Sequence, residues 1–239
     1  MEKLKPTITP EINEAEKSLN ELKSRHPDNA LFKDNFAAEI PKNFISIFHY
    51  TGEDRIDRIG KEGLKPLLGA FDKEEWKKFT DEETGNRFGS RQMFKLERAF
   101  TRIAKERGLG DYNRVKNVVF GFPHPADDLE SGARAKIGKN IALEIKIDPS
   151  KVILADASVY TEFMDGLSDD IQDYDLSEEQ IEINRIKCAK KYWDTAMSYD
   201  DYAKLDLETK GQMKRYEILV NCGKEGISPD FIKVAGVIE

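Results

Sequence analysis

The chain has 239 residues, of which 39% are hydrophobic, 10% aromatic and 35% charged, and its formal net charge is −7. This composition supplies enough apolar material for a folded core, and the acidic balance excludes a protein whose whole surface grips nucleic acid. No apolar run approaches the roughly 18 residues that span a bilayer, and the first residues carry no secretory pattern. The two cysteines, Cys188 and Cys222, are too few for a disulfide framework or a metal cluster of their own. We therefore expect a cytoplasmic protein with reduced thiols, no metal and no membrane partner.

The first predicted element is a helix over residues 10–25, where apolar residues recur at three- and four-residue steps among polar ones. Pro27 ends this helix, because proline disfavours the helical conformation in the residue before it. We treat residues 1–43 as an N-terminal helical extension and residues 44–239 as the main domain.

The main domain opens with a strand over residues 44–50, which is rich in aromatic and β-branched side chains. A short helix is predicted directly after it, with Thr51 as its N-terminal cap and Gly63 as its C-terminal stop. The sequence thus predicts a strand, a sharp turn and a short helix in close succession.

The remaining elements follow without a regular strand–helix–strand rhythm. A helix over residues 90–107 has an apolar inner face, and the segment 87–116 holds nine Lys or Arg, Arg114 among them, against three acids. Residues 162–182 hold nine acids and no Lys or Arg, and they lead into a helix over about 177–196. Strands are predicted over residues 118–122, 141–147, 152–154, 216–220 and 234–238. The predicted fold class is α+β and not a doubly wound parallel sheet.

Two residues stand out as candidates for chemistry. His49 ends an apolar strand just before a helix, where backbone amides and side chains often converge on polar ligands. Glu217 opens an otherwise apolar strand, so its carboxylate is exposed, paired or functional. The alternatives are a histidine at the core edge that bonds to backbone, and a solvent-facing glutamate. The sequence contains no nucleotide-binding glycine loop, zinc-protease motif, EF-hand loop or nucleophile elbow.

Residues 48–51, Phe-His-Tyr-Thr, followed by Gly-Leu-Lys-Pro at 63–66, resemble the opening of ADP-ribosyltransferase-fold proteins. Residues 216–220, Tyr-Glu-Ile-Leu-Val, with Ile-Ser-Pro-Asp-Phe-Ile at 227–232, are similar to the last catalytic strand of that family. The pair of motifs is most similar to the DarT-type branch of DNA-modifying toxins and its relatives. The layout covers about residues 44–239, and the motif match is confined to its two ends.

The resemblance implies a split β-sheet core with peripheral helices and an enzyme that transfers ADP-ribose from NAD to a macromolecular acceptor, either protein or nucleic acid. In that setting Glu217 would bond to the nicotinamide ribose and stabilise the positive charge that develops there. His49 would bond to a ribose hydroxyl, the backbone at Tyr50 would hold the carboxamide, and Thr51 would steady the turn. A toxin-like role would also imply an antitoxin or another regulatory partner.

The central part of the chain departs from the family pattern. The tyrosine that stacks on nicotinamide in the family is not placed by a motif. Tyr160 is one candidate for it, and Phe120 or Phe122 is another. Arg87 or Arg91 could neutralise the NAD pyrophosphate, although the basic helix could equally dock against the acidic tract.

Arg215 stands where arginine-modifying members of the family carry Gln or Glu, which disfavours arginine as the acceptor.

Three other functions on this fold stay open. Two of them are an NAD glycohydrolase and a non-catalytic module that binds NAD, another nucleotide or a partner. A tRNA 2′-phosphotransferase-like activity is less favoured by the overall acidity.

Overall fold

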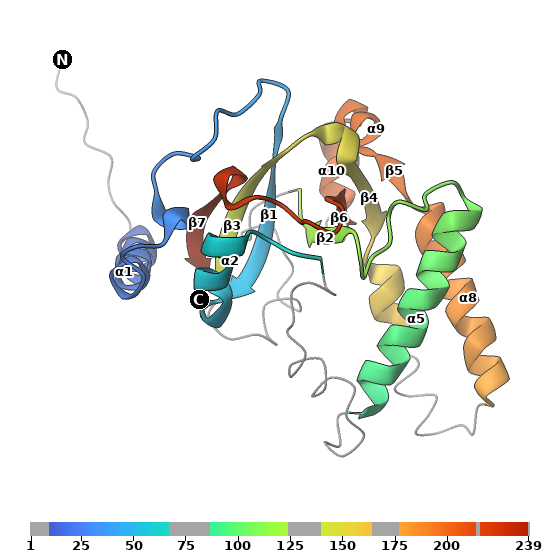
Figure 1. The fold of residues 1–239 in the computed structure, drawn as a ribbon. Coiled ribbons are helices and arrows are strands. Elements are labelled where there is room, and N and C mark those ends of the chain that lie inside the picture. The colour runs from blue at the N-terminus through green and yellow to red at the C-terminus, as the bar shows by residue number, and fades with distance from the viewer. Residues whose placement is uncertain (1–9, 67–86, 124–139, 164–176, 214–215, 239) are drawn as a thin grey trace.

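A computed structural model describes residues 10–66, 87–123, 140–163, 177–213 and 216–238 (Figure 1). The described strands form two antiparallel sheets, ordered β1-β3-β7 and β2-β6-β4-β5. The strands are β1 (Ile45–Gly52), β2 (Val118–Gly121), β3 (Asn140–Ile147), β4 (Val152–Asp156), β5 (Met197–Ser198), β6 (Tyr216–Asn221) and β7 (Ile232–Ile238). The α-helices are α1 (Pro10–Arg25), α2 (Ile56–Glu62), α5 (Arg87–Glu106), α8 (Glu178–Asp194), α9 (Tyr199–Lys204) and α10 (Leu207–Gln212).

The two sheets meet through an isolated bridge between β1 and Phe122, the residue that follows β2. The amide of Phe48 donates to the carbonyl of Phe122 at 3.0 Å, and the amide of Phe122 donates back at 2.8 Å. Gly121 makes this approach possible, because a Cβ there would lie 2.9 Å from the carbonyl oxygen of Phe48. The junction between the sheets therefore depends on a glycine at the end of β2.

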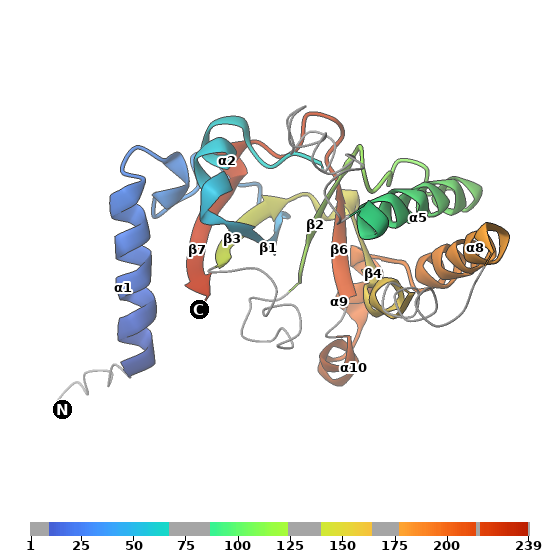
Figure 2. The ribbon, with the colours of Figure 1, turned by 90° about the horizontal axis from the view of Figure 1, so that it is seen from below.

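The four-stranded sheet is buried on both faces, which explains why the sequence of β6 is almost continuously apolar. Ile218 and Val220 point into the core between the two sheets, together with Ile47 from β1. Leu219 points the other way and packs with Phe100 of α5 in a second core. Figure 2 shows α5 and α8 on one side of β6 and β4, with the three-stranded sheet on the other. Both cores are thus organised around the same strand.

The N-terminal extension packs directly onto the main domain. Leu22 and Leu31 are almost fully buried in the core that lies between the sheets. The Arg25 guanidinium donates to both carboxylate oxygens of Glu53 at 2.6 and 3.0 Å, and Asn29 donates to the carbonyl of Ile56 at 2.9 Å. The described part of residues 1–43 therefore shares a core with the domain that follows it.

The structure confirms the predicted α+β class and the main predicted elements, including the helix over residues 10–25 and the stop at Gly63. The predicted cap at Thr51 is wrong, because Gly52 occupies the cap position with no side-chain hydrogen bond. The short elements between residues 197 and 212 were not predicted. In the described ranges, no helix has the length and apolar character needed to cross a membrane.

We expect Gly121→Ala to lower the free energy of unfolding by about 1–3 kcal/mol, because the new Cβ would push the Phe48 carbonyl out of the bridge. Urea denaturation measures the change. Gly236→Ala in β7 is the matched control, since a Cβ there has no heavy atom within 4 Å. Equal losses in the two variants would show that the close approach at Gly121 is not the cause.

Candidate functional site

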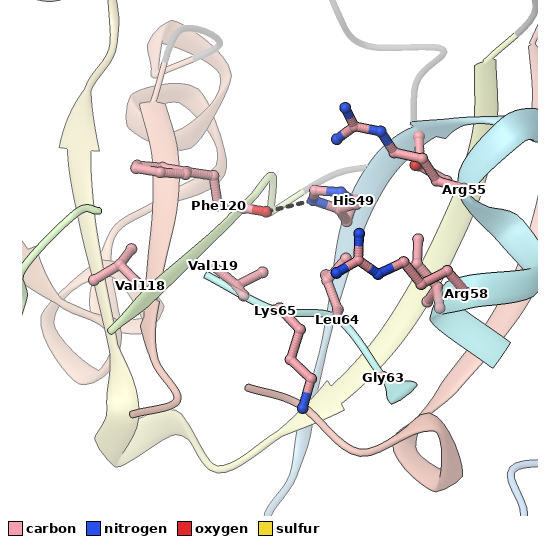
Figure 3. Close-up of a pocket in the computed structure, with 11 residues that line it drawn as sticks. His49, Arg55, Arg58, Gly63, Leu64, Lys65, Val118, Val119 and Phe120 are labelled. Atoms are coloured by element: carbon pink, nitrogen blue, oxygen red, sulfur yellow. Dashed lines mark hydrogen bonds between the residues drawn. The ribbon is translucent and has the colours of Figure 1, made fainter. Parts of the chain in front are cut away.

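A pocket of about 150 Å³ opens between β1, β2 and α2 (Figure 3). Its walls are mostly apolar, and among the described residues that line it the charged side chains are all basic. They are His49, Thr51, Arg55, Arg58, Ile59, Gly63, Leu64, Lys65, Val118, Val119 and Phe120. The local fold produces this arrangement because the sharp turn after β1 places α2 beside the end of that strand.

His49 is a neutral imidazole with a defined tautomer. Its Nδ1 lies 2.8 Å from the carbonyl oxygen of Phe120, and a carbonyl only accepts, so Nδ1 carries the hydrogen. Burial lowers the pKa of His49, and the nearby charge of Arg55 lowers it further, while the bond to Phe120 opposes both effects. Nε2 is therefore left as a hydrogen-bond acceptor, which suits a ribose hydroxyl or an amide.

Basic side chains give the pocket a positive rim. Figure 3 shows the side chains of Arg55 and Arg58 extending from the α2 side toward His49. Arg58 also donates to Glu62 at 3.3 Å, and Lys65 donates to the carbonyl of Glu225 at 2.6 Å. An apolar wall next to basic side chains and a neutral acceptor favours a ligand with both an aromatic and an anionic part.

Glu217 belongs to a different group of residues, centred on the buried Arg114. Arg114 Nη1 donates to Glu217 Oε1 at 2.7 Å, and its Nε lies 3.0 and 3.2 Å from the two oxygens of Glu97. Tyr192 donates its hydroxyl proton to Glu217 Oε1 and accepts from Arg114 Nη1. These four residues, Glu97, Arg114, Tyr192 and Glu217, form what we call the Arg114 cluster.

Aromatic rings surround the guanidinium of Arg114. Its central carbon lies 4.5 Å from the ring centroid of Phe120, 4.8 Å from that of Tyr192 and 5.5 Å from that of Tyr160. Such contacts favour a cation and exclude water. Burial alone would lower the pKa of Arg114, but the adjoining carboxylates raise it, so the guanidinium stays charged. Burial raises the pKa of Glu97. Burial also raises the pKa of the Tyr192 hydroxyl, which therefore stays protonated.

The candidate residues therefore separate into two groups. His49 follows Ile47 by two positions, and Glu217 adjoins Ile218, while Ile47 and Ile218 share the core between the sheets. Since side chains alternate along a strand, His49 points toward the core between the sheets, as Ile47 does. Glu217 points away from that core, because its neighbour Ile218 points into it.

The other predicted site residues also divide. Thr51 lines the pocket with His49, whereas Tyr160 lies beside Arg114 with Glu217. Tyr50 does not line the pocket, and its ring packs 5.6 Å from that of Phe122. The side chains of Arg87 and Arg91 in α5 lie outside the described residues.

Several functional candidates were missed in the sequence. The sequence identifies Arg114 only as one of the basic residues in the segment 87–116. No sequence pattern around it distinguishes it from the exposed basic residues nearby. Arg55 and Arg58 carry a usable signal, since they lie three residues apart at the start of the short helix after His49. Where both partners lie in the described residues, the expected docking of the basic helix against the acidic tract is seen as an ion pair between Lys95 and Glu178 at 2.8 Å.

Comparison of the chain with family models, with curated proteins and with solved structures finds no match. We therefore infer a function from the residues and geometry described above.

We expect Arg114→Gln to destabilise the protein by about 3–5 kcal/mol, because it leaves buried carboxylates without their cation. Thermal and urea denaturation measure the loss. Arg107→Gln is the matched control, since Arg107 pairs with an exposed carboxylate at Asp194 and should matter far less. Similar losses in both variants would contradict a special role for the buried cation.

The lowered pKa of His49 predicts a pH-dependent stability. As the pH falls through about 6.5, the unfolded chain binds a proton at this position before the folded chain does, so the free energy of unfolding decreases. The slope from one such group is at most about 1.4 kcal/mol per pH unit. Urea denaturation between pH 8 and pH 5 should show that His49→Gln lacks this part of the slope. Parallel curves for the two proteins would contradict the assignment.

Proposed function

We propose that the protein binds NAD in the His49 pocket and transfers its ADP-ribose to a macromolecular acceptor, as an ADP-ribosyltransferase with a split-sheet core. The observation that carries the proposal is the pocket itself. It joins a neutral histidine, an apolar wall and a basic rim at the strand end where the family resemblance places the NAD-binding histidine.

The chemistry of each group fits NAD. Nε2 of His49 can accept a hydrogen bond from a ribose hydroxyl, and Arg55 and Arg58 can neutralise the pyrophosphate. Ile59, Leu64 and Val119 give the pocket an apolar wall against which a base could pack. In the described residues, two antiparallel sheets are joined at the Phe48–Phe122 bridge, which is compatible with the split core of the proposed family.

Glu217 would stabilise the transition state in this proposal. The bond between ribose C1′ and the nicotinamide nitrogen breaks, and its electron pair leaves with nicotinamide. The acceptor heteroatom then bonds to C1′ and gives up its proton to a base. Positive charge develops on the ribose meanwhile, and a nearby carboxylate lowers its energy. Because Glu217 points away from the core that His49 faces, this role requires an extended dinucleotide that passes the junction between β1 and β2.

A second candidate function is a module that binds NAD or another nucleotide without reacting with it. The specific observation in its favour is that Glu217 lies on the face opposite His49 and bonds to Arg114 and Tyr192. In this case the pocket keeps its ligand, while the carboxylate serves the packing of α5 and α8.

The test is nicotinamide release from NAD by the wild type and Glu217→Gln, with protein, RNA and single-stranded DNA each offered as acceptor. We expect the wild type to release nicotinamide and Glu217→Gln to lose at least 100-fold in rate, because the substitution removes the stabilising charge. Calorimetry should show that both proteins bind NAD with similar affinity. His49→Asn, whose amide can still donate to the Phe120 carbonyl, should weaken that binding.

Each other outcome has a defined meaning. NAD binding without nicotinamide release under any condition would identify the binding module. Absence of NAD binding in the wild type would overturn both functions. Release that survives in Glu217→Gln would exclude Glu217 as the reactive carboxylate.

A further inference from the structure

We propose that Arg114 and Tyr192 are positioning residues, which hold the Glu217 carboxylate in one orientation and present its second oxygen to the substrate. This inference rests on the proposed function, because it takes Glu217 as the carboxylate that acts on NAD.

The hydrogen bonds to Glu217 are strongly asymmetric. Arg114 and Tyr192 both donate to Oε1, and they approach it from different parts of the chain. Among the described residues, none donates to Oε2. The side chain of Glu217 is 14% exposed, whereas that of Arg114 is 6% exposed. Oε1 is thus held by two buried donors, and we take Oε2, which has no donor among the described residues, as the oxygen that meets the substrate.

The two donors are themselves fixed. Arg114 is clamped by the carboxylate of Glu97, which leaves Nη1 aimed at Glu217. Tyr192 is fully buried, and its ring packs edge-on against Phe100 and Trp193 with centroids 4.7 and 5.1 Å apart. Neither donor can follow the carboxylate if it rotates, so both bonds favour a single rotamer of Glu217.

The fixed orientation of Glu217 should affect the rate of nicotinamide release but not the affinity for NAD. A carboxylate that is already oriented costs no reorganisation when charge develops on the ribose. NAD in the ground state would contact the His49 pocket, and neither Arg114 nor Tyr192 lines that pocket. Loss of a positioning bond should therefore lower kcat and leave NAD binding intact.

Tyr192→Phe is the decisive variant, because it removes one hydroxyl and keeps the buried ring. We expect kcat for nicotinamide release to fall about tenfold or more, with an unchanged dissociation constant for NAD measured by calorimetry. Tyr202→Phe is the control, since Tyr202 is a buried tyrosine in the other core. It should keep the wild-type kcat. Arg114→Lys should retain more activity than Arg114→Gln when both are compared at equal folded concentration.

The outcomes separate this inference from the proposed function. A wild-type protein that releases nicotinamide beside a Tyr192→Phe variant with unchanged kcat would overturn the positioning role alone. An equal fall in kcat for Tyr192→Phe and Tyr202→Phe would also overturn it. A wild-type protein that releases no nicotinamide would overturn the proposed function, and this inference with it.

Discussion

The buried guanidinium of Arg114 joins elements that lie far apart in the sequence. It contacts Glu97 on α5, Tyr192 on α8 and Glu217 on β6, and its charge is compensated by the carboxylates on both sides. A buried cation cannot be left without such partners, because the loss of hydration would not be offset. Arg114 therefore links α5, α8 and β6 by polar contacts inside the apolar core that packs them together.

Phe120 connects this cluster to the pocket on the other face. Its carbonyl oxygen accepts from His49, and its ring lies 4.5 Å from the Arg114 guanidinium. One residue of β2 thus fixes the tautomer of the candidate binding histidine and packs against the cation that orients Glu217. A shift in β2 would disturb both groups together. The strand is held by its pairing with β6 and by the bridge between Phe48 and Phe122.

Local patterns predicted the elements more completely than the site. Period-two and period-three-to-four apolar spacing located most strands and helices, and the positive φ of 78° at Gly63 matches the predicted stop. The Arg114 cluster could not be predicted, because its members are separated by up to 120 positions and meet only after the sheet forms. Thr51 failed as a cap because a 3-10 turn starting after Gly52 precedes α2.

Stability alone gives little reason for such a cluster. Buried ion pairs are often matched or exceeded in stability by apolar side chains of similar size, so the contact between α5, α8 and β6 does not itself require Glu97, Arg114 and Glu217. An apolar replacement would fill the same space, but it could not supply a carboxylate with one oxygen held by Arg114 and Tyr192. The polar cluster is explained more fully by what it presents at Glu217 than by the packing it provides.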